Sequence, residues 1–227
     1  MIIGNGLIAS SFHPHFENNA DVIIFASGVS NSRETNPAAF QREERLLMNA
    51  LASKKYLVYF STCSLSDPEL QQSPYVMHKI KIEELVRSSK GYAIFRLTQV
   101  VGKTSNPHTL TNYLYQHITS DTPFQIWRHA KRNLIDVDDV VSIATYLIQS
   151  PRMSRITENI ACPFSIGIDE LVRIFEHVLR KKAVYTLKDA GGAYAIDTRL
   201  ATAAAKNISI DFNENYTEKL LRKYYVS

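Results

Sequence analysis

The chain has few cysteines and no long apolar run. Cys63 and Cys162 are its two cysteines, too few for a disulfide framework or a thiolate metal site. No stretch approaches the roughly 18–20 apolar residues of a membrane span, and the first residues lack the basic start of a signal peptide. The histidines show no metal-ligand spacing, so no metal is predicted. These absences favour a soluble cytoplasmic protein with reduced thiols.

Net charge is small, and no basic tract stands out. Lys plus Arg is 26 and Asp plus Glu is 22, which leaves a formal charge of +4 over 227 residues. The basic residues are dispersed, so nucleic acid is not a predicted partner, although a mild preference for anionic ligands is expected. With 45% hydrophobic and 21% charged residues, the composition is that of a folded globular protein.

Strand and helix patterns alternate along the first two thirds of the chain. Short β-branched and aromatic runs predict strands at 1–3, 21–26, 56–61 and 92–97, with weaker ones at 133–137 and 157–161. Helical patterns occupy 7–12, 37–54, 74–88, 108–119, 138–149, 167–180 and 216–224. This order predicts the α/β class, with a doubly wound parallel sheet. We expect one domain, with residues 1–102 as a nucleotide-binding core and 103–227 as further core elements plus a small substrate-binding lobe.

A glycine turn joins the first strand to the first helix. The sequence Gly4-Asn5-Gly6-Leu7-Ile8-Ala9 has the spacing that brings a pyrophosphate close to backbone N–H groups at a helix start. A plain strand-to-helix turn is the alternative. The acidic residue that usually ends the second strand of a dinucleotide site is missing, because Asp21 opens that strand.

Hydroxyl and ammonium groups follow the third strand. Thr62 ends the strand, and Tyr75 and Lys79, four residues apart, share one face of the next helix. An ammonium beside a phenol lowers the pKa of the phenol, and such a phenol can exchange a proton with a sugar hydroxyl or ketone. An ordinary surface pair is the alternative. His78 is expected to point away from this face and to be a helix-surface or packing residue rather than a base.

Five segments in this order resemble the extended short-chain dehydrogenase/reductases, in the branch called NAD-dependent epimerase/dehydratases, which act on nucleotide sugars. The segments are 4–9, 21–27, Thr62 with Tyr75 and Lys79, 96–102, and 132–140.

The resemblance implies a Rossmann-like fold, NAD or NADP as cofactor, a nucleotide-sugar substrate and a homodimer. It implies a reductase or epimerase, of the kind used in polysaccharide biosynthesis, in which Tyr75 moves the proton and Thr62 orients the reacting oxygen. Lys79 would hold the nicotinamide ribose and lower the pKa of Tyr75. The implied cofactor contacts are Gly4, Asn5, Gly6, Leu7, Ile8, Ala26, Ser27, Lys79 and Thr98, and the implied substrate contacts are Gln99 and Arg132.

The chain also departs from the family pattern. Two strands and a helix that hold the adenosine half of the cofactor are missing, so the first strand should lie at an edge of the sheet, covered by residues 13–20 or by a second subunit. Cys63 and Ser64 stand where dehydratases carry an acidic pair, so dehydration is not expected. Arg33 is a weak candidate for a 2′-phosphate contact. The alternative function is a non-catalytic member that binds a sugar nucleotide or a partner protein.

Overall fold

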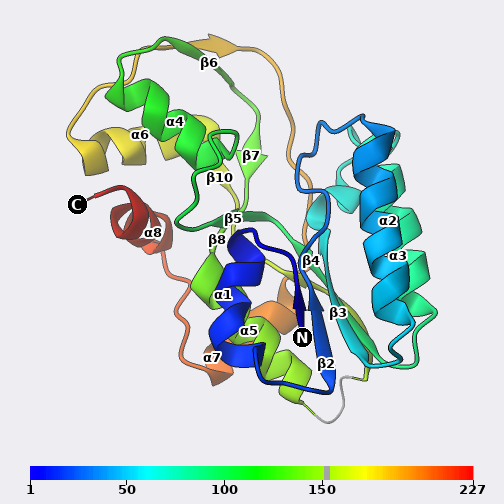
Figure 1. Ribbon diagram of the computed structural model, residues 1–227. Coiled ribbons are helices and arrows are strands. Elements are labelled where there is room, and N and C mark those ends of the chain that lie inside the picture. The colour runs from blue at the N-terminus through cyan, green and yellow to red at the C-terminus, as the bar shows by residue number, and fades with distance from the viewer. Residues whose placement is uncertain (151–153, 227) are drawn as a thin grey trace.

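The computed structural model describes residues 1–150 and 154–226, and its centre is a five-stranded parallel sheet (Figure 1). The strand order is β1-β2-β3-β4-β9. The strands are β1 (Ile2–Ile3), β2 (Val22–Phe25), β3 (Tyr56–Thr62), β4 (Tyr92–Leu97) and β9 (Arg155–Ile160). The predicted parallel sheet is confirmed, and the weak strand at 157–161 belongs to it.

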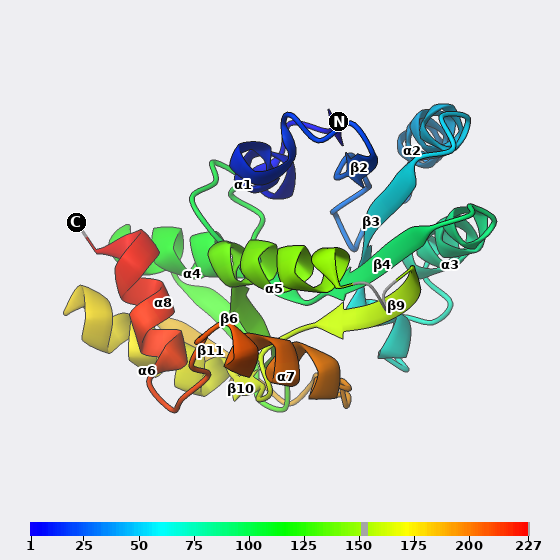
Figure 2. The same ribbon diagram turned by 90° about the horizontal axis from the view of Figure 1, so that it is seen from below.

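Helices cover both faces of this sheet, as a doubly wound fold requires (Figure 2). One face carries α1 (Leu7–Phe16), α5 (Val137–Gln149) and α7 (Arg199–Asn207). The other carries α2 (Pro37–Leu51) and α3 (Pro74–Arg87). Strand β3 shows why both faces need a cover: Val58 and Phe60 enter one hydrophobic cluster, while Leu57 and Tyr59 enter the other.

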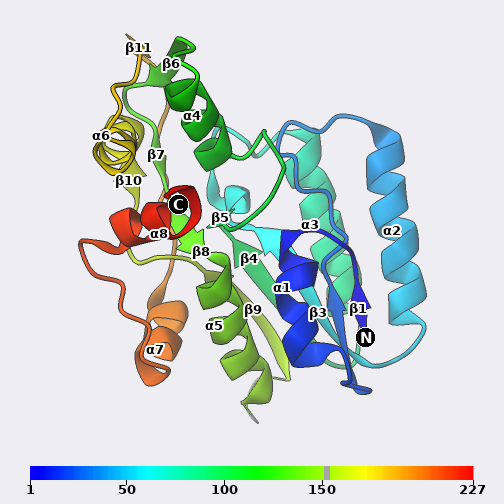
Figure 3. The ribbon, with the colours of Figure 1, turned by 60° about the vertical axis from the view of Figure 1, so that its left-hand side comes forward.

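A smaller lobe lies beyond the carboxyl end of β3 (Figure 3). It has its own hydrophobic cluster, in which Leu114, Ile126, Leu171 and Phe175 are buried. Its elements are α4 (Leu110–Thr119), β6 (Phe124–Trp127), β7 (Lys131–Arg132), β10 (Ile166–Gly167), α6 (Ile168–Leu179), β11 (Tyr185–Lys188) and α8 (Tyr216–Tyr225). Two short strands, β5 (Gln99–Val101) and β8 (Leu134–Asp136), pair with each other outside the main sheet.

The first helix runs further than the sequence pattern indicates. The prediction ended it at residue 12, but α1 continues through Pro14 to Phe16. A proline inside a helix costs about 3 kcal/mol because it removes a backbone hydrogen bond. Here Phe12 and Phe16 are both buried with ring centroids 5.9 Å apart, and we infer that this burial offsets the loss.

Strand β1 is an edge strand, as expected from the missing segments. It pairs with β2 through Ile2 opposite Ile24 and Ile3 opposite Phe25, and no strand of the described residues pairs with its other side. Residues 13–20, the segment expected to cover this edge, contact the residue before β1: the Met1 amino group donates to the Asn19 carbonyl oxygen at 2.9 Å.

Two further features bear on the sequence analysis. Cys63 and Cys162 are free and buried. Among residues 1–150 and 154–226, no helix has both the length and the apolar character needed to cross a membrane.

Candidate active site

The predicted hydroxyl cluster forms at the carboxyl end of β3. Thr62, 8% exposed, ends this strand, and its Oγ1 accepts the Ser64 backbone N–H at 3.1 Å to begin a 3-10 turn, η1 (Cys63–Ser66). Tyr75 is the second residue of α3, a helix that starts at Pro74 with the Ser73 side chain as its cap. The Tyr75 hydroxyl lies near the Thr62 side chain, whose influence acts to lower the pKa of Tyr75. The end of β3 and the start of α3 therefore bring these two groups together.

The electrostatics at Tyr75 differ from the prediction. Burial raises the pKa of Tyr75 to about 12, the Thr62 side chain opposes the rise, and the charge of Glu43 adds to it. The Lys79 ammonium lies 5.8 Å from the centroid of the Tyr75 ring. The pKa of Tyr75 is therefore raised, chiefly by burial, where a lowered value was expected, and the lysine is held by another partner.

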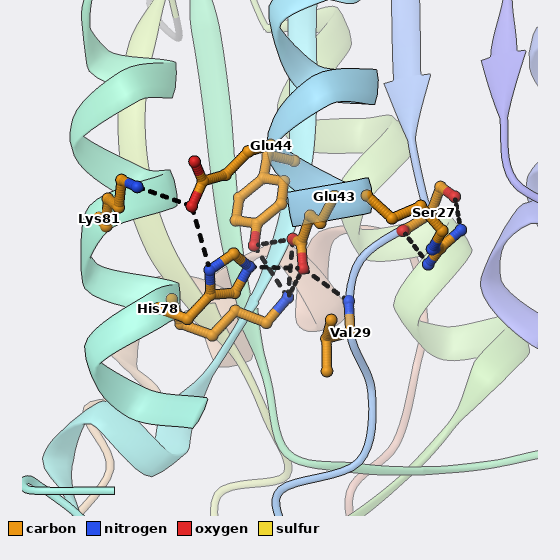
Figure 4. A network of polar contacts seen from close by, with 9 residues as sticks. Ser27, Val29, Glu43, Glu44, His78 and Lys81 are labelled. Atoms are coloured by element: carbon orange, nitrogen blue, oxygen red, sulfur yellow. Dashed lines mark hydrogen bonds and ion pairs between the residues drawn. The ribbon is translucent and has the colours of Figure 1, made fainter. Parts of the chain in front are cut away.

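That partner is Glu43 on α2, a carboxylate that the sequence analysis did not single out (Figure 4). Lys79 Nζ donates to Glu43 Oε1 at 3.0 Å and to the Tyr59 hydroxyl at 2.9 Å. The Tyr59 hydroxyl in turn donates to Glu43 Oε1 at 2.7 Å. Both Glu43 and Lys79 are almost inaccessible to solvent, at 0% and 2% exposure.

The second carboxylate oxygen of Glu43 is equally engaged. Glu43 Oε2 accepts the Val29 backbone N–H at 2.6 Å and lies 3.0 Å from His78 Nε2. Although burial alone would raise the pKa of Glu43, the His78, Lys79, Val29 and Tyr59 contacts lower it to about 2. His78 is buried and stacks on Phe40, so it does serve packing, but it faces the partner of Lys79 rather than pointing away.

The glycine turn lies against the end of β2. Gly4 has a φ of +132°, and a Cβ there would come within 2.4 Å of the Ala26 carbonyl oxygen. A Cβ on Gly28 would lie 2.7 Å from Lys79 Nζ. The short stretch from Ala26 to Gly28 thus connects the glycine turn with the buried ion pair, and the predicted contacts Gly4, Ala26 and Ser27 do come together.

The second glycine of the turn, Gly6, has open space around it. A Cβ on Gly6 would meet no atom within 4 Å, and Gly6 is the N-cap of α1 without a side-chain cap. The first N–H groups of α1 are therefore available to an anion such as a pyrophosphate. Asn5 is exposed, Ile8 packs on the core, and Leu7 packs against Gly102. The turn fits a dinucleotide pyrophosphate.

The adenosine side of the site is less complete. The sheet of the described residues ends at β1, and Ala26 and Ser27 follow β2 where an acidic residue is usual. The exposed Arg42 guanidinium donates to Ser27 Oγ at 3.2 Å and to the Ser27 carbonyl oxygen at 3.1 Å. Arg33 is exposed in the loop that follows β2.

Thr98 and Gln99 lie next to each other after β4. The Thr98 hydroxyl donates to Asn133 Oδ1 at 3.1 Å, so this predicted cofactor contact is tied to the loop before β8. Gln99 is half-buried in β5, and its Oε1 atom has no hydrogen-bond partner among the described residues. The structure does not bring these two side chains into contact with Tyr75.

Arg132 reaches the hydroxyl cluster through a residue that the sequence analysis missed. The extended segment 189–198 leaves the lobe and passes the end of the sheet on its way to α7 (Figure 1). Its Tyr194 hydroxyl lies near the Ser64 side chain and close enough to Arg132 and Tyr75 to interact electrostatically with both. The site therefore combines groups from the sheet and from the lobe.

Only one of the two missed residues leaves a sequence signal. Glu43 occupies the apolar face of α2 that also carries Phe40, Leu47 and Ala50, and a carboxylate on such a face needs a buried partner. Tyr194 lies in a segment without periodicity, so its position depends on the path of the chain between the lobe and α7.

Several solved structures share this fold. UDP-glucuronic acid 4-epimerase from Bacillus cereus, complexed with UDP-glucuronic acid and NAD, superposes with a TM-score of 0.73 at 17% identity, covering 99% of this chain and 89% of that chain. RMD from Pseudomonas aeruginosa, complexed with NADPH, gives 0.67 at 13% identity, with coverages of 92% and 82%. dTDP-glucose 4,6-dehydratase from Bacillus anthracis, complexed with NAD, gives 0.68 at 15%, with coverages of 96% and 77%.

Comparison with curated protein sequences found no match. The sequence does match the model of the NAD dependent epimerase/dehydratase family over residues 9–162, which is more than half of the chain. That span includes Thr62, Tyr75, Lys79 and Arg132, the residues around which the site is built. The chain therefore belongs to the NAD dependent epimerase/dehydratase family.

Proposed function

We propose that the protein is an NAD(P)-dependent reductase or epimerase of a nucleotide-linked sugar. The observation that carries the proposal is that Thr62, Tyr75 and Tyr194 lie near one another at the carboxyl end of β3, with Arg132 within electrostatic range of Tyr194. In parallel α/β sheets, ligands bind at this end of the strands. The family match and the fold shared with nucleotide-sugar enzymes add to this support.

In this proposal, Gly6 and the start of α1 bind the cofactor pyrophosphate, and Ala26 and Ser27 line its path. The cofactor supplies or accepts hydride at a sugar carbon. Tyr75 moves the proton of the reacting oxygen, and Thr62 orients that oxygen by hydrogen bonding. Arg132 binds the diphosphate of the sugar nucleotide, because a guanidinium matches phosphate geometry. A homodimer is part of the proposal and is measurable by light scattering.

Dehydration is not proposed. Burial raises the pKa of the Cys63 thiol to about 12, so this group holds its proton at neutral pH, and it donates to the Arg96 carbonyl oxygen at 3.3 Å. Because Cys63 holds its proton and the Ser64 hydroxyl is a weak acid, neither residue after Thr62 is suited to expel a sugar hydroxyl.

Cofactor binding is the direct test. Titration of the protein with NADH and NADPH should enhance nicotinamide fluorescence, and addition of UDP-linked keto sugars should then oxidise the reduced cofactor. Gly6→Asp provides a control, because a carboxylate in the open space of the turn would repel the pyrophosphate. If neither dinucleotide changes fluorescence at millimolar concentration, the oxidoreductase proposal fails.

One observation favours a second function, a non-catalytic protein that binds a sugar nucleotide or a partner. Lys79, the residue that the resemblance assigns to the nicotinamide ribose, donates hydrogen bonds to both carboxylate oxygens of Glu43 and to the Tyr59 hydroxyl, and it is 2% exposed. This hypothesis predicts that calorimetry gives the same affinity for UDP-sugars in the presence and in the absence of dinucleotide. The redox proposal predicts that cofactor strengthens sugar binding.

A further inference from the structure

The buried ion pair of Glu43 and Lys79 lies close to both Gly28 and Tyr75. We propose that Glu43 is a positioning residue: in a site where burial already favours the neutral phenol, it pairs with Lys79 and holds the ammonium away from Tyr75, which stays a proton donor for a carbonyl oxygen of the sugar. This inference rests on the proposed function and deepens it, because it names the protonated form of Tyr75 as the group that meets the sugar carbonyl.

The ion pair is closed. Glu43 Oε1 accepts from Lys79 and Tyr59, and Oε2 accepts from Val29 and, at 3.4 Å, from Lys79, with His78 nearby. These contacts fill the acceptor capacity of a carboxylate. Glu43 is 0% exposed, so water does not screen the pair. A negative charge therefore lies about 3 Å from the Lys79 ammonium and weakens its electrostatic effect on Tyr75.

Lys79 lies near Tyr75 but is hydrogen-bonded to other residues. Lys79 Nζ lies 5.8 Å from the Tyr75 ring centroid and 5.2 Å from the Tyr59 ring centroid. Its hydrogen-bond partners, Glu43 and Tyr59, lie on α2 and β3, and Tyr75 is not among them. Tyr75 thus has an ammonium near its ring face but no hydrogen bond from it.

Several charged and titratable groups face Tyr75. Thr62 and Cys63 face it from β3 and η1, Glu43 from α2, Lys79 from α3 and Tyr194 from the segment before α7. Glu43 is the group of this set that carries a negative charge at neutral pH, and its charge opposes formation of a tyrosinate. Removal of that charge should leave Lys79 free to stabilise the tyrosinate.

A protonated tyrosine is suited to one direction of the reaction. In the reduction of a ketone, hydride from the reduced nicotinamide dinucleotide forms a C–H bond at the carbonyl carbon, and the π bond of the carbonyl breaks. The Tyr75 hydroxyl gives its proton to the carbonyl oxygen, which becomes a hydroxyl. The cofactor is oxidised, the ketone is reduced, and solvent returns a proton to Tyr75. In the reverse reaction a tyrosinate takes this proton back, so the Glu43 charge should move the pH dependence of that direction to higher pH.

Tyrosine labelled at Cζ with carbon-13 tests this by NMR, because the Cζ signal reports ionisation of each phenol. Tyr75→Phe and Tyr59→Phe identify the two relevant signals. In the wild-type protein the Tyr75 signal should show a protonated phenol beyond about pH 10, the ordinary pKa of a phenol. In Glu43→Gln its midpoint should fall by at least about one pH unit. A wild-type midpoint below 10, or an unchanged midpoint in Glu43→Gln, would overturn the inference.

Glu44→Gln is the matched control. Glu44 is the next residue on α2, lies 3.8 Å from His78 Nδ1 and binds the exposed Lys81, but it does not contact Lys79. Its substitution should leave the Tyr75 midpoint unchanged, and a shift as large as that of Glu43→Gln would overturn a specific role for Glu43.

A double variant covers the case in which Glu43→Gln does not fold. Glu43→Gln with Lys79→Gln removes both charges, so the Tyr75 midpoint should stay close to that of the wild type, and a fall of a full unit would overturn the inference. Cofactor fluorescence is measured on the same samples. If Tyr75 titrates as expected but no dinucleotide binds, the proposed function fails and the charge arrangement is supported.

Discussion

The carboxylate of Glu43 and the ammonium of Lys79 lie 3.0 Å apart, and both side chains are buried between α2, α3 and β3. The lysine belongs to the spacing that marks the catalytic helix, whereas the glutamate comes from a different helix. Their pairing changes the expected role of the lysine, because its charge is compensated inside the protein. Several measurable consequences follow from this arrangement and from the glycine turn beside it.

Lys79→Met should strongly destabilise the protein. It would leave the Glu43 carboxylate buried without its cation, which costs about 3–5 kcal/mol in the free energy of unfolding. Urea unfolding at pH 7 measures the loss. The double variant Glu43→Gln with Lys79→Met should recover most of it, since no unpaired charge remains. A double variant as unstable as Lys79→Met alone would contradict this account.

Stability should fall in acid through Glu43. Its folded pKa of about 2 lies below the ordinary value of 4.5, so the stabilisation is fully present above about pH 4.5 and is lost as the pH falls towards 2. A difference of this size corresponds to about 3 kcal/mol. Urea unfolding at a series of pH values should show a steeper loss for the wild type than for Glu43→Gln. Parallel curves would exclude Glu43 as the source.

Tyr75→Phe should remove catalysis while the fold is retained. Loss of the transferable proton should lower turnover of a UDP-linked keto sugar by about 10²–10⁴-fold. Because phenylalanine keeps the ring that packs with Val29 and Val76, the melting temperature should change little. Tyr113→Phe, at a position 37% exposed on α4, is the control and should keep full turnover. Retention of turnover in Tyr75→Phe would remove this residue from the mechanism.

The two glycines of the turn should respond differently to alanine. At Gly4 the φ of +132° and the 2.4 Å approach to the Ala26 carbonyl oxygen leave no room, so Gly4→Ala should lower stability by at least about 1–3 kcal/mol. At Gly6 a Cβ meets no protein atom, so Gly6→Ala should keep the fold and weaken dinucleotide binding. Thermal melts and nicotinamide fluorescence separate the two effects. Equal melting temperatures for both variants would contradict this distinction.

The sheet and its main helices could be predicted from local patterns. Strand β3 alternates between two buried faces, and α3 begins at Pro74 with a serine cap, so both elements have short-range signals. The pairs β5 with β8 and β7 with β10 were not predicted in their observed form, because strands of two or three residues carry too little periodicity. The weak strand at 133–137 was placed correctly in the sequence, but it lies outside the main sheet.

What the amino-acid sequence determined by itself is the set of groups on each element: a glycine turn before α1, a threonine at the end of β3, and a tyrosine and a lysine one helical turn apart on α3. These follow from 3.6-residue and two-residue periodicities, which depend on near neighbours. Only the tertiary structure decided that Glu43 captures Lys79 and that Tyr194 meets Ser64 and Arg132. Contacts between distant elements depend on how helices pack on the sheet and how the lobe returns to it, and no local spacing contains that information.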